Sequence, residues 1–426
     1  MSITETAPAF FLAVMVILVV CKMVSWLAAR AGQAPVVGEM IAGVLLGPSL
    51  LGLLWAGSQT LFFPAAVRPL LYVAGQLGLV LFMFQAGYEF TAHRPRGAWR
   101  SAGFVSAAGT LGPLLLGILL SVALGDWSGA LLPNVPFLVS AGFVGVALAI
   151  TAFPMLARII SERNLSGTRF GSISLGCGAI DDVVAWILLA VVIGAASGNS
   201  RPILLAAVGA VAFAALLSTV GRRFLGWTMT NKMSEEQRLL LTVLLLFAAA
   251  YFTDKVGLYA VFGAFCVGVV LPHGEAADRM IALVGPVNRT IFLPLFFVYS
   301  GLNTRFALLA DPRLLLFTIA CVLVAVVGKL GSCWAAARVA GEEQPVAIRV
   351  GVLMNARGLM QLIAINVGLA AGIVSSALFT ALVVVALVTT TMTGPVLTWI
   401  DRRDRRQAGE RPLNSARLHQ PISAGD

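Results

Sequence analysis

The stretch Leu175-Gly-Cys-Gly-Ala-Ile-Asp-Asp-Val-Val-Ala-Trp-Ile-Leu-Leu-Ala190 places two adjacent carboxylates, Asp181 and Asp182, inside an otherwise apolar run. If this run crosses a bilayer, both acids lie near its centre, where a charge costs roughly 3 kcal/mol on insertion scales. Acids at that depth mark ion pathways or proton relays. The alternative is a pair at a helix end that faces water or a neighbouring helix. Apolar residues continue for about three helical turns after the pair, which favours the intramembrane interpretation.

The composition of the whole chain is that of a membrane protein. Hydrophobic residues make up 59% of the 426 residues and charged residues 11%, whereas an average soluble domain has about 25% charged residues. The 43 glycines suit closely packed transmembrane helices. The net charge of +10 comes from basic residues scattered through short loops and an Arg-rich tail, so we expect no nucleic-acid partner. The five cysteines form no metal-spaced cluster, and we expect no cofactor.

Long apolar segments recur along the chain, and they predict an all-α polytopic membrane protein with about 13 transmembrane helices. A twelve-span count is the alternative, because two of the segments are short. The predicted spans are about 9–29, 36–54, 68–88, 101–124, 136–160, 170–196, 202–220, 237–252, 257–272, 281–302, 313–337, 344–370 and 373–399.

The basic residues predict an orientation. Counted over alternate loops, one side of the membrane carries twenty Lys and Arg residues and the other five. The positive-inside rule assigns the richer side to the cytoplasm. The N-terminus is then outside and the C-terminus inside, which requires an odd number of spans. The Arg-rich residues 401–426 form a short cytoplasmic tail in this interpretation.

Two predicted spans are interrupted at corresponding places. The fifth contains the run from Thr151 to Pro154, and the twelfth contains Asn355, Arg357 and Gly358. Proline breaks helical hydrogen bonding, and matched broken helices in two inverted halves indicate a transporter site near the midplane. Because the two spans are seven apart, helices 1–6 and 8–13 form two inverted six-helix repeats. An ordinary kink at Pro154 and a helix end at residues 355–358 are the alternatives.

Few other charges remain at membrane depth. Lys329 lies between apolar residues, and a buried ammonium needs a partner, for which Asp181 or Asp182 is the obvious candidate. A purely structural salt bridge is the alternative for Lys329. Arg357 is better explained as a structural counter-charge for the facing ends of broken helices than as a substrate contact.

The adjacent aspartates cannot face each other, because neighbouring helical residues project about 100° apart. One can pair with Lys329 while the other faces a cavity beside Thr151. There, unwound carbonyls and a carboxylate could replace the hydration shell of a small cation, since hard cations prefer oxygen ligands. The same carboxylate can hold a proton instead. Competition between a cation and a proton for one carboxylate is the core of an antiport mechanism.

These residues resemble the monovalent cation:proton antiporter superfamily, and most closely its second branch of Kef-type, CHX-type and NapA-like sodium or potassium/proton exchangers. The resemblance covers about residues 9–399. Its motifs, in order, are Pro35-Val-Val-Gly-Glu-Met-Ile-Ala-Gly-Val-Leu-Leu-Gly-Pro-Ser-Leu-Leu-Gly52, Gly87-Tyr-Glu-Phe90, Thr151-Ala-Phe-Pro-Met-Leu-Ala-Arg158, Asp181-Asp182, Pro294-Leu-Phe-Phe-Val-Tyr-Ser-Gly-Leu302, Lys329 and Met354-Asn-Ala-Arg-Gly-Leu359.

The resemblance implies a NapA-like antiporter fold within residues 1–400, with two crossed, broken helices. It implies core helices at about 101–196 and 313–399, and dimerisation or scaffold helices at about 9–88 and 202–302. In such a fold the core moves against the scaffold of a homodimer to alternate access. The chain is then an integral protein of a bacterial inner membrane that exchanges Na⁺ or K⁺, and possibly also Li⁺, for protons.

The resemblance also implies the roles of individual residues. The ion-binding carboxylate falls on Asp182, the preceding acid on Asp181, and the lysine that pairs with that acid on Lys329. Thr151 and Pro154 match one unwound position, and Asn355 and Arg357 match the other. The chain departs from many relatives at Gln361, where they carry a glutamate, and it continues only briefly after the last span.

Three other functions compete with antiport. A cation channel or uniporter could use the same fold, and so could a sensor that does not transport. An intramembrane aspartyl protease needs two carboxylates on different helices that share a proton. Because the mid-membrane acids here are sequence neighbours, we expect a transporter and not an enzyme.

Overall fold

The computed structural model describes residues 3–33, 35–48, 50–55, 57–92, 99–165, 167–196 and 200–408. Every regular element in these ranges is a helix, as expected for an all-α protein. The chain divides into two compact units, each assembled from segments far apart in the sequence. The first unit comprises residues 1–27, 38–93 and 190–305. The second comprises residues 28–37, 94–189 and 306–426.

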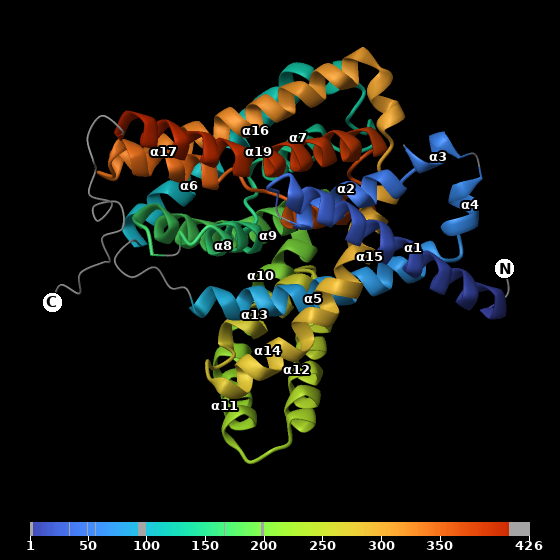
Figure 1. Ribbon diagram of the computed structural model, residues 1–426, viewed down its shortest axis with the longest axis vertical. Helices are drawn as coiled ribbons and strands as arrows, with labels where there is room; N and C mark the ends of the chain where they lie inside the picture. The colour runs from blue at the N-terminus through green and yellow to red at the C-terminus, as the bar shows by residue number, and fades with distance from the viewer. Residues whose placement is uncertain are drawn as a thin grey trace. The chain divides into compact units, whose positions relative to one another are not determined.

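The first unit is built around α5, which packs against α13, α15 and the π-helical segment η2. In Figure 1, α11 and α12 form a helical hairpin within this unit. Its helices are α1 (Ile3–Arg30), α2 (Pro35–Leu46), α3 (Leu51–Leu54), α4 (Ser58–Phe62), α5 (Arg68–Ala92), α10 (Ser200–Leu216), η1 (Leu217–Gly221), α11 (Arg222–Thr230), α12 (Glu235–Lys255), α13 (Ala260–Val270), α14 (Glu275–Val287), η2 (Asn288–Phe292) and α15 (Leu293–Leu302).

The second unit is built around α16, which packs against α6, α17 and α19 (Figure 1). α6 also packs against α7. The helices of this unit are α6 (Trp99–Ser128), α7 (Phe137–Ala149), α8 (Phe153–Glu162), most of α9 (Arg169–Ala196), η3 (Phe306–Ala310), α16 (Pro312–Val339), α17 (Gln344–Leu353), α18 (Leu359–Ala370) and α19 (Ser376–Ala408). All of the predicted site residues lie in this second unit. The assignment of the second unit as the moving core, and of the first unit as the dimer scaffold, stays a prediction.

Among the described residues, ten helical stretches are long and apolar enough to cross a membrane, and each falls on a predicted span. One of them, Phe137–Ser161, comprises α7 and α8. The other three predicted segments contain shorter apolar helices, namely α2, α13 and the pair α17 and α18. A helix of twelve residues is about 18 Å long, against about 30 Å of hydrocarbon. Crossing at these places would therefore need flanking or non-helical residues as well. The count of thirteen spans stays a prediction.

Glycines allow the helices of the second unit to approach closely. A Cβ atom at Gly112 of α6 would lie 2.8 Å from the Cβ atom of Ser332 on α16. A Cβ atom at Gly117 would lie 2.7 Å from the Cα atom of Gly145 on α7. Small residues at helix crossings are the usual means of close packing in membranes. Here they bring α6 against both α7 and α16, around the predicted ion site.

Candidate functional site

The first helix break separates α7 from α8. α7 ends at Ala149 and α8 begins at Phe153, and between them Ile150 and Ala152 have extended backbone. Pro154 lies in the first turn of α8 rather than in the break itself. A proline is tolerated there because the first turn of a helix has free N–H groups in any case. The predicted interruption is therefore a true break and not a proline kink.

The second helix break separates α17 from α18. α17 ends at Leu353 and α18 begins at Leu359. Gly358 has φ 92° and ψ −123° there, a conformation that a residue with a Cβ atom adopts only with strain. The two breaks meet, because the backbone N–H of Ala152 donates to the carbonyl of Ala356 over 3.1 Å.

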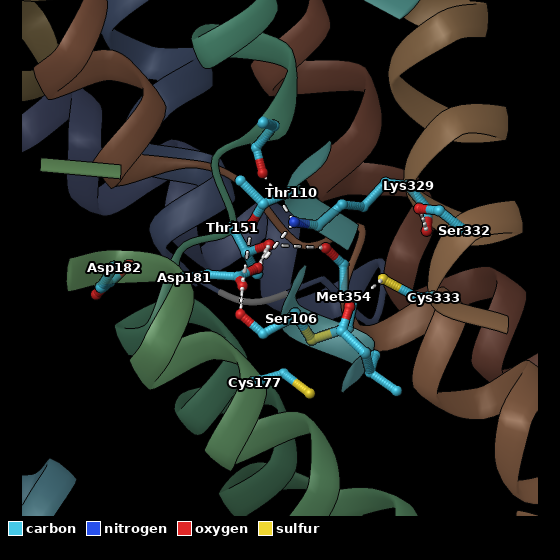
Figure 2. A network of polar contacts seen from close by, with 12 residues as sticks. Ser106, Thr110, Thr151, Cys177, Asp181, Asp182, Lys329, Ser332, Cys333 and Met354 are labelled. Atoms are coloured by element: carbon cyan, nitrogen blue, oxygen red, sulfur yellow. Dashed lines mark hydrogen bonds and ion pairs between the residues drawn. The ribbon is translucent and has the colours of Figure 1, made fainter. Parts of the chain in front are cut away.

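Asp181 is the centre of a buried polar network beside the first break (Figure 2). Its Oδ2 atom accepts from the ammonium of Lys329 at 2.8 Å and from the Thr151 hydroxyl at 2.9 Å. Its Oδ1 atom accepts from the Ser106 hydroxyl at 2.5 Å, with Thr110 at 3.4 Å. Both oxygens of Asp181 are thus committed to donors from the protein.

Lys329 links this network to the end of α7. Its ammonium donates to the Asp181 carboxylate and to the carbonyl of Ala149, each over 2.8 Å. Ala149 is the last residue of α7, where helix carbonyls lack intrahelical partners and carry partial negative charge. Both side chains of the ion pair are almost completely buried. Lys329 therefore neutralises a carboxylate and a helix end together.

Asp182 is fully buried and turns away from the Asp181 network (Figure 2). Its Oδ1 atom lies 3.4 Å from the backbone nitrogen of Phe153, the first residue of α8, where the helix dipole favours negative charge. Its Oδ2 atom has no hydrogen-bond partner among the residues that the structure describes. The two adjacent aspartates thus have opposite surroundings, one saturated with donors and the other with a free oxygen.

Arg357 is fully buried and braces the second break. Its guanidinium donates to the carbonyl of Ala147 at 3.0 Å and to that of Ala325 at 3.2 Å. It thereby joins the end of α7 to α16, and both of these hydrogen bonds are to backbone carbonyls rather than to the charged side chains of the site. Asn355 donates to the Met392 sulfur over 3.7 Å. The structure thus brings Thr151, Asp181 and Lys329 together, and holds Asn355 and Arg357 in separate contacts.

Two residues of this site were absent from our sequence interpretation, Ser106 and Thr110 of α6. They are four positions apart, so they share one face of an apolar helix, and that spacing was the available signal. Gly109 lies between them, and a Cβ atom there would stand 2.5 Å from the Cys333 sulfur on α16, the helix that carries Lys329. α6 therefore supplies the two hydroxyls, and its glycine lets α16 approach closely.

The residues at the first break offer oxygen atoms to a cation. In the described part of the chain, no three His, Cys, Asp or Glu side chains gather as a metal site would require. Oxygen ligands are present as the free carboxylate oxygen of Asp182 and as carbonyls at the breaks, and hard cations accept such ligands. A single free carboxylate can hold a cation or a proton, but it neutralises only one charge at a time.

Comparison with known proteins agrees with this geometry. Residues 15–402 match the sodium/hydrogen exchanger transmembrane family. The chain is 36% identical over 394 residues to the Na⁺/H⁺ antiporter NhaS4 of Synechocystis sp., covering 90% of this chain and 95% of that protein. It is 30% identical over 394 residues to the K⁺/H⁺ antiporter 1 of Saccharomyces cerevisiae, covering 89% of this chain but only 45% of that longer protein.

A solved structure shares the fold. The sodium proton antiporter MjNhaP1 of Methanocaldococcus jannaschii superimposes with a TM-score of 0.63 at 15% identity, over 92% of this chain and 96% of that one. The predicted resemblance to the second branch of the cation:proton antiporters is thereby confirmed. The chain belongs to the sodium/hydrogen exchanger family, and it is a monovalent cation/proton antiporter rather than an enzyme.

Proposed function

We propose that Asp182 is the carboxylate that binds the exchanged cation and the proton in turn, while Asp181 and Lys329 form a fixed charge pair beside it. One observation carries the proposal. Asp182 is the member of the pair with a buried oxygen that lacks a hydrogen-bond partner among the described residues, whereas both oxygens of Asp181 accept donors. A buried carboxylate oxygen without a donor is unfavourable unless a cation or a proton supplies the missing interaction.

In this proposal Thr151 and the break carbonyls complete the site. The Thr151 hydroxyl lies 2.9 Å from the Asp181 carboxylate and 3.3 Å from the Met354 carbonyl. It has one hydrogen, so it donates to only one of these acceptors at a time. The Thr151 backbone lies in the break, so its carbonyl can serve as a cation ligand, whereas the Ala152 carbonyl accepts from the Leu156 N–H over 2.9 Å as the first hydrogen bond of α8. The N-terminus of α8 beside Asp182 stabilises the carboxylate when no cation is bound.

The transported cation in this proposal is Na⁺ or K⁺. The relatives named above exchange one or the other, according to their names. Because Asp182 cannot hold both ions together, a cation bound from one side is replaced by a proton on the other. Alternating access then couples the two fluxes, since the loaded carboxylate is carried from one side to the other.

We place the protein in a bacterial inner membrane as a homodimer, with the N-terminus outside and the C-terminus in the cytoplasm. The excess of Lys and Arg in alternate loops supports this orientation. Cysteine labelling from each side tests it. A reporter at position 232 should react only from the cytoplasmic side and one at position 313 only from outside, and the reverse pattern would contradict the orientation.

Flux measurements in proteoliposomes test the exchange mechanism. We expect an imposed pH gradient to drive uphill uptake of Na⁺ or K⁺, with Li⁺ and Rb⁺ measured beside them. Apparent cation affinity should weaken as pH falls, by up to about tenfold per unit, while the maximal rate changes much less. An apparent cation affinity that stays constant as pH falls would contradict the model in which cation and proton compete for one carboxylate. Uptake that follows the membrane potential but not the pH gradient would indicate a uniporter.

A further inference from the structure

Helix α19 is longer than the membrane requires. Its 33 residues extend about 50 Å, whereas the hydrocarbon layer is about 30 Å thick. The membrane-spanning candidate within it ends at Asp404. Because charged residues are rare at membrane depth, we expect the turns from Trp399 onward to lie at the membrane surface. These turns contain two acids, Asp401 and Asp404, on one face of the helix. Arg402 and Arg403 lie on the opposite face.

The acids of this helix end turn inward to one buried arginine. The guanidinium of Arg349 on α17 lies 2.5 Å from Asp404 and 3.2 Å from Asp401, and its side chain is only 7% exposed. It also stacks 5.6 Å from the centre of the Phe170 ring. Arg349 is held on several sides, and its single positive charge offsets one of the two negative charges.

The opposite face presents an exposed stripe of Trp399, Arg402 and Arg403, which we call the α19 stripe. Arg402 and Arg403 follow Trp399 by three and four residues, and Trp399 is 60% exposed. The Arg403 guanidinium lies 5.8 Å from the Trp399 ring centre, a cation–π contact. In the sequence the same spacing continues with Arg406. Tryptophan beside arginine is typical of residues at the level of lipid headgroups.

The same helix end is bonded to one half of each broken helix. Arg163, the residue that ends α8, donates to the Gly394 carbonyl at 2.9 Å and to the Thr398 hydroxyl at 3.1 Å. Arg349 belongs to α17 and holds Asp401 and Asp404. A displacement of the α19 end would therefore pull directly on α8 and on α17.

We propose that the α19 stripe binds the headgroups of anionic phospholipids, and that the bound lipid steadies α8 and α17 through Arg163 and Arg349. Charge complementarity and the exposed tryptophan favour lipid as the occupant. A free phosphate would use the arginines but not the Trp399 ring, which gains from the apolar boundary of the bilayer. The effect on exchange rests on the function proposed above, whereas lipid binding does not.

The binding experiment compares the wild type with an Arg402→Gln/Arg403→Gln variant. Both are reconstituted with phosphatidylcholine alone or with added phosphatidylglycerol. Thermal unfolding and native mass spectrometry then report lipid binding without any transport assay. We expect phosphatidylglycerol to raise the wild-type Tm, and the variant to lose that increment while keeping its phosphatidylcholine Tm. Lipid affinity should fall on the order of tenfold, and high salt should have the same effect.

A charge-matched control separates the stripe from general surface charge. The Arg222→Gln/Lys232→Gln variant removes two exposed positive charges from the first unit, and it should keep the full phosphatidylglycerol increment. Equal losses in the two variants would overturn the proposal. Inorganic phosphate, added to the wild type in phosphatidylcholine, should not reproduce the increment. If phosphate does raise the Tm as phosphatidylglycerol does, the α19 stripe binds free phosphate rather than lipid.

The Arg349→Gln variant tests transmission to the broken helices. Because Asp401 and Asp404 are partly exposed, we expect this variant to fold and to bind phosphatidylglycerol as the wild type does. Its exchange rate should no longer rise with phosphatidylglycerol. A rate that still follows the lipid as in the wild type would exclude transmission through Arg349. If no variant exchanges cations, the binding arm alone still decides the lipid site.

Discussion

The two helix breaks of the second unit have similar outlines but different chemistry. At the first, between α7 and α8, no residue from Ile150 to Ala152 is charged, and the charges come from other helices: Lys329 at the end of α7 and Asp182 at the start of α8. At the second, between α17 and α18, Arg357 belongs to the break itself and is bonded to carbonyls of other helices.

This difference suggests a division of roles. Where the charges beside a break belong to neighbouring helices, a carboxylate there can bind a cation or a proton in turn while the backbone of the break stays in place. A break that carries its own arginine, whose guanidinium donates to two backbone carbonyls, serves as a brace. We therefore expect substitutions around the first break to abolish transport. Substitutions at the second break should mainly reduce the stability of the protein.

The largest effect should follow Asp182→Asn, which removes the exchangeable charge at the first break. Cation-driven proton flux should fall to the background of empty liposomes, because an amide cannot alternate between a cation and a proton. The protein should remain folded, since the amide keeps an acceptor for the Phe153 N–H group. Flux in proteoliposomes and the Tm test this together. Wild-type flux at saturating cation would remove Asp182 from the mechanism.

The next largest effect concerns the charge pair that supports the first break. Lys329→Ala leaves the Asp181 carboxylate buried without its cation, which should cost on the order of 3–5 kcal/mol of unfolding free energy. Asp181→Asn in that background should recover part of the loss, because the uncompensated charge is removed. A double-mutant cycle on unfolding free energies measures the coupling. Additive losses would show that the pair does not act as a unit.

A moderate effect should follow Gly358→Ala at the second break. Its φ of 92° and ψ of −123° strain any residue with a Cβ atom, so unfolding should become easier by about 1–3 kcal/mol. Apparent cation affinity should be unchanged if this break is only a brace. The matched change at the first break, Ala152→Gly, requires no unusual φ and should cost less than about 1 kcal/mol. A large shift in cation affinity in Gly358→Ala would contradict the division of roles.

The smallest effect should come from the loop before α17, outside both breaks. Burial raises the pKa of Glu342, but hydrogen bonds from Arg169 and Ser101 outweigh it, and the net pKa is lowered. A lowered folded-state pKa gives stability that is present above the ordinary glutamate pKa and is lost as pH falls through the folded value. The Tm of the wild type should therefore fall below about pH 5.

Glu342→Gln is the variant that isolates this contribution. It should remove about 1 kcal/mol at neutral pH, because the partner Arg169 is 43% exposed and its ion pair is screened by solvent. The difference in Tm between wild type and variant should shrink toward acidic pH. A difference that is the same at pH 7 and pH 4 would assign the effect to packing instead.

Most of the helical framework could be predicted because membrane insertion depends on local composition. Each spanning helix falls on an apolar segment, and the acids at Asp181 and Asp182 stand out because charge is rare at that depth. The interruption near Pro154 could be located for a similar reason, since proline acts on its own helix turn. Its bounds, from Ile150 to Ala152 with Pro154 already inside α8, required the backbone itself.

Local composition is enough to predict the membrane class, the positions of the apolar helices and the few charges that must find partners. Which partners they find depends on how distant helices pack. Lys329 lies 148 residues from Asp181, and Ser106 lies 75 residues from it. Their meeting depends on how α6, α9 and α16 are rotated and how closely glycines let them approach. Sequence patterns report local burial, whereas the free oxygen of Asp182 arises from three-dimensional packing.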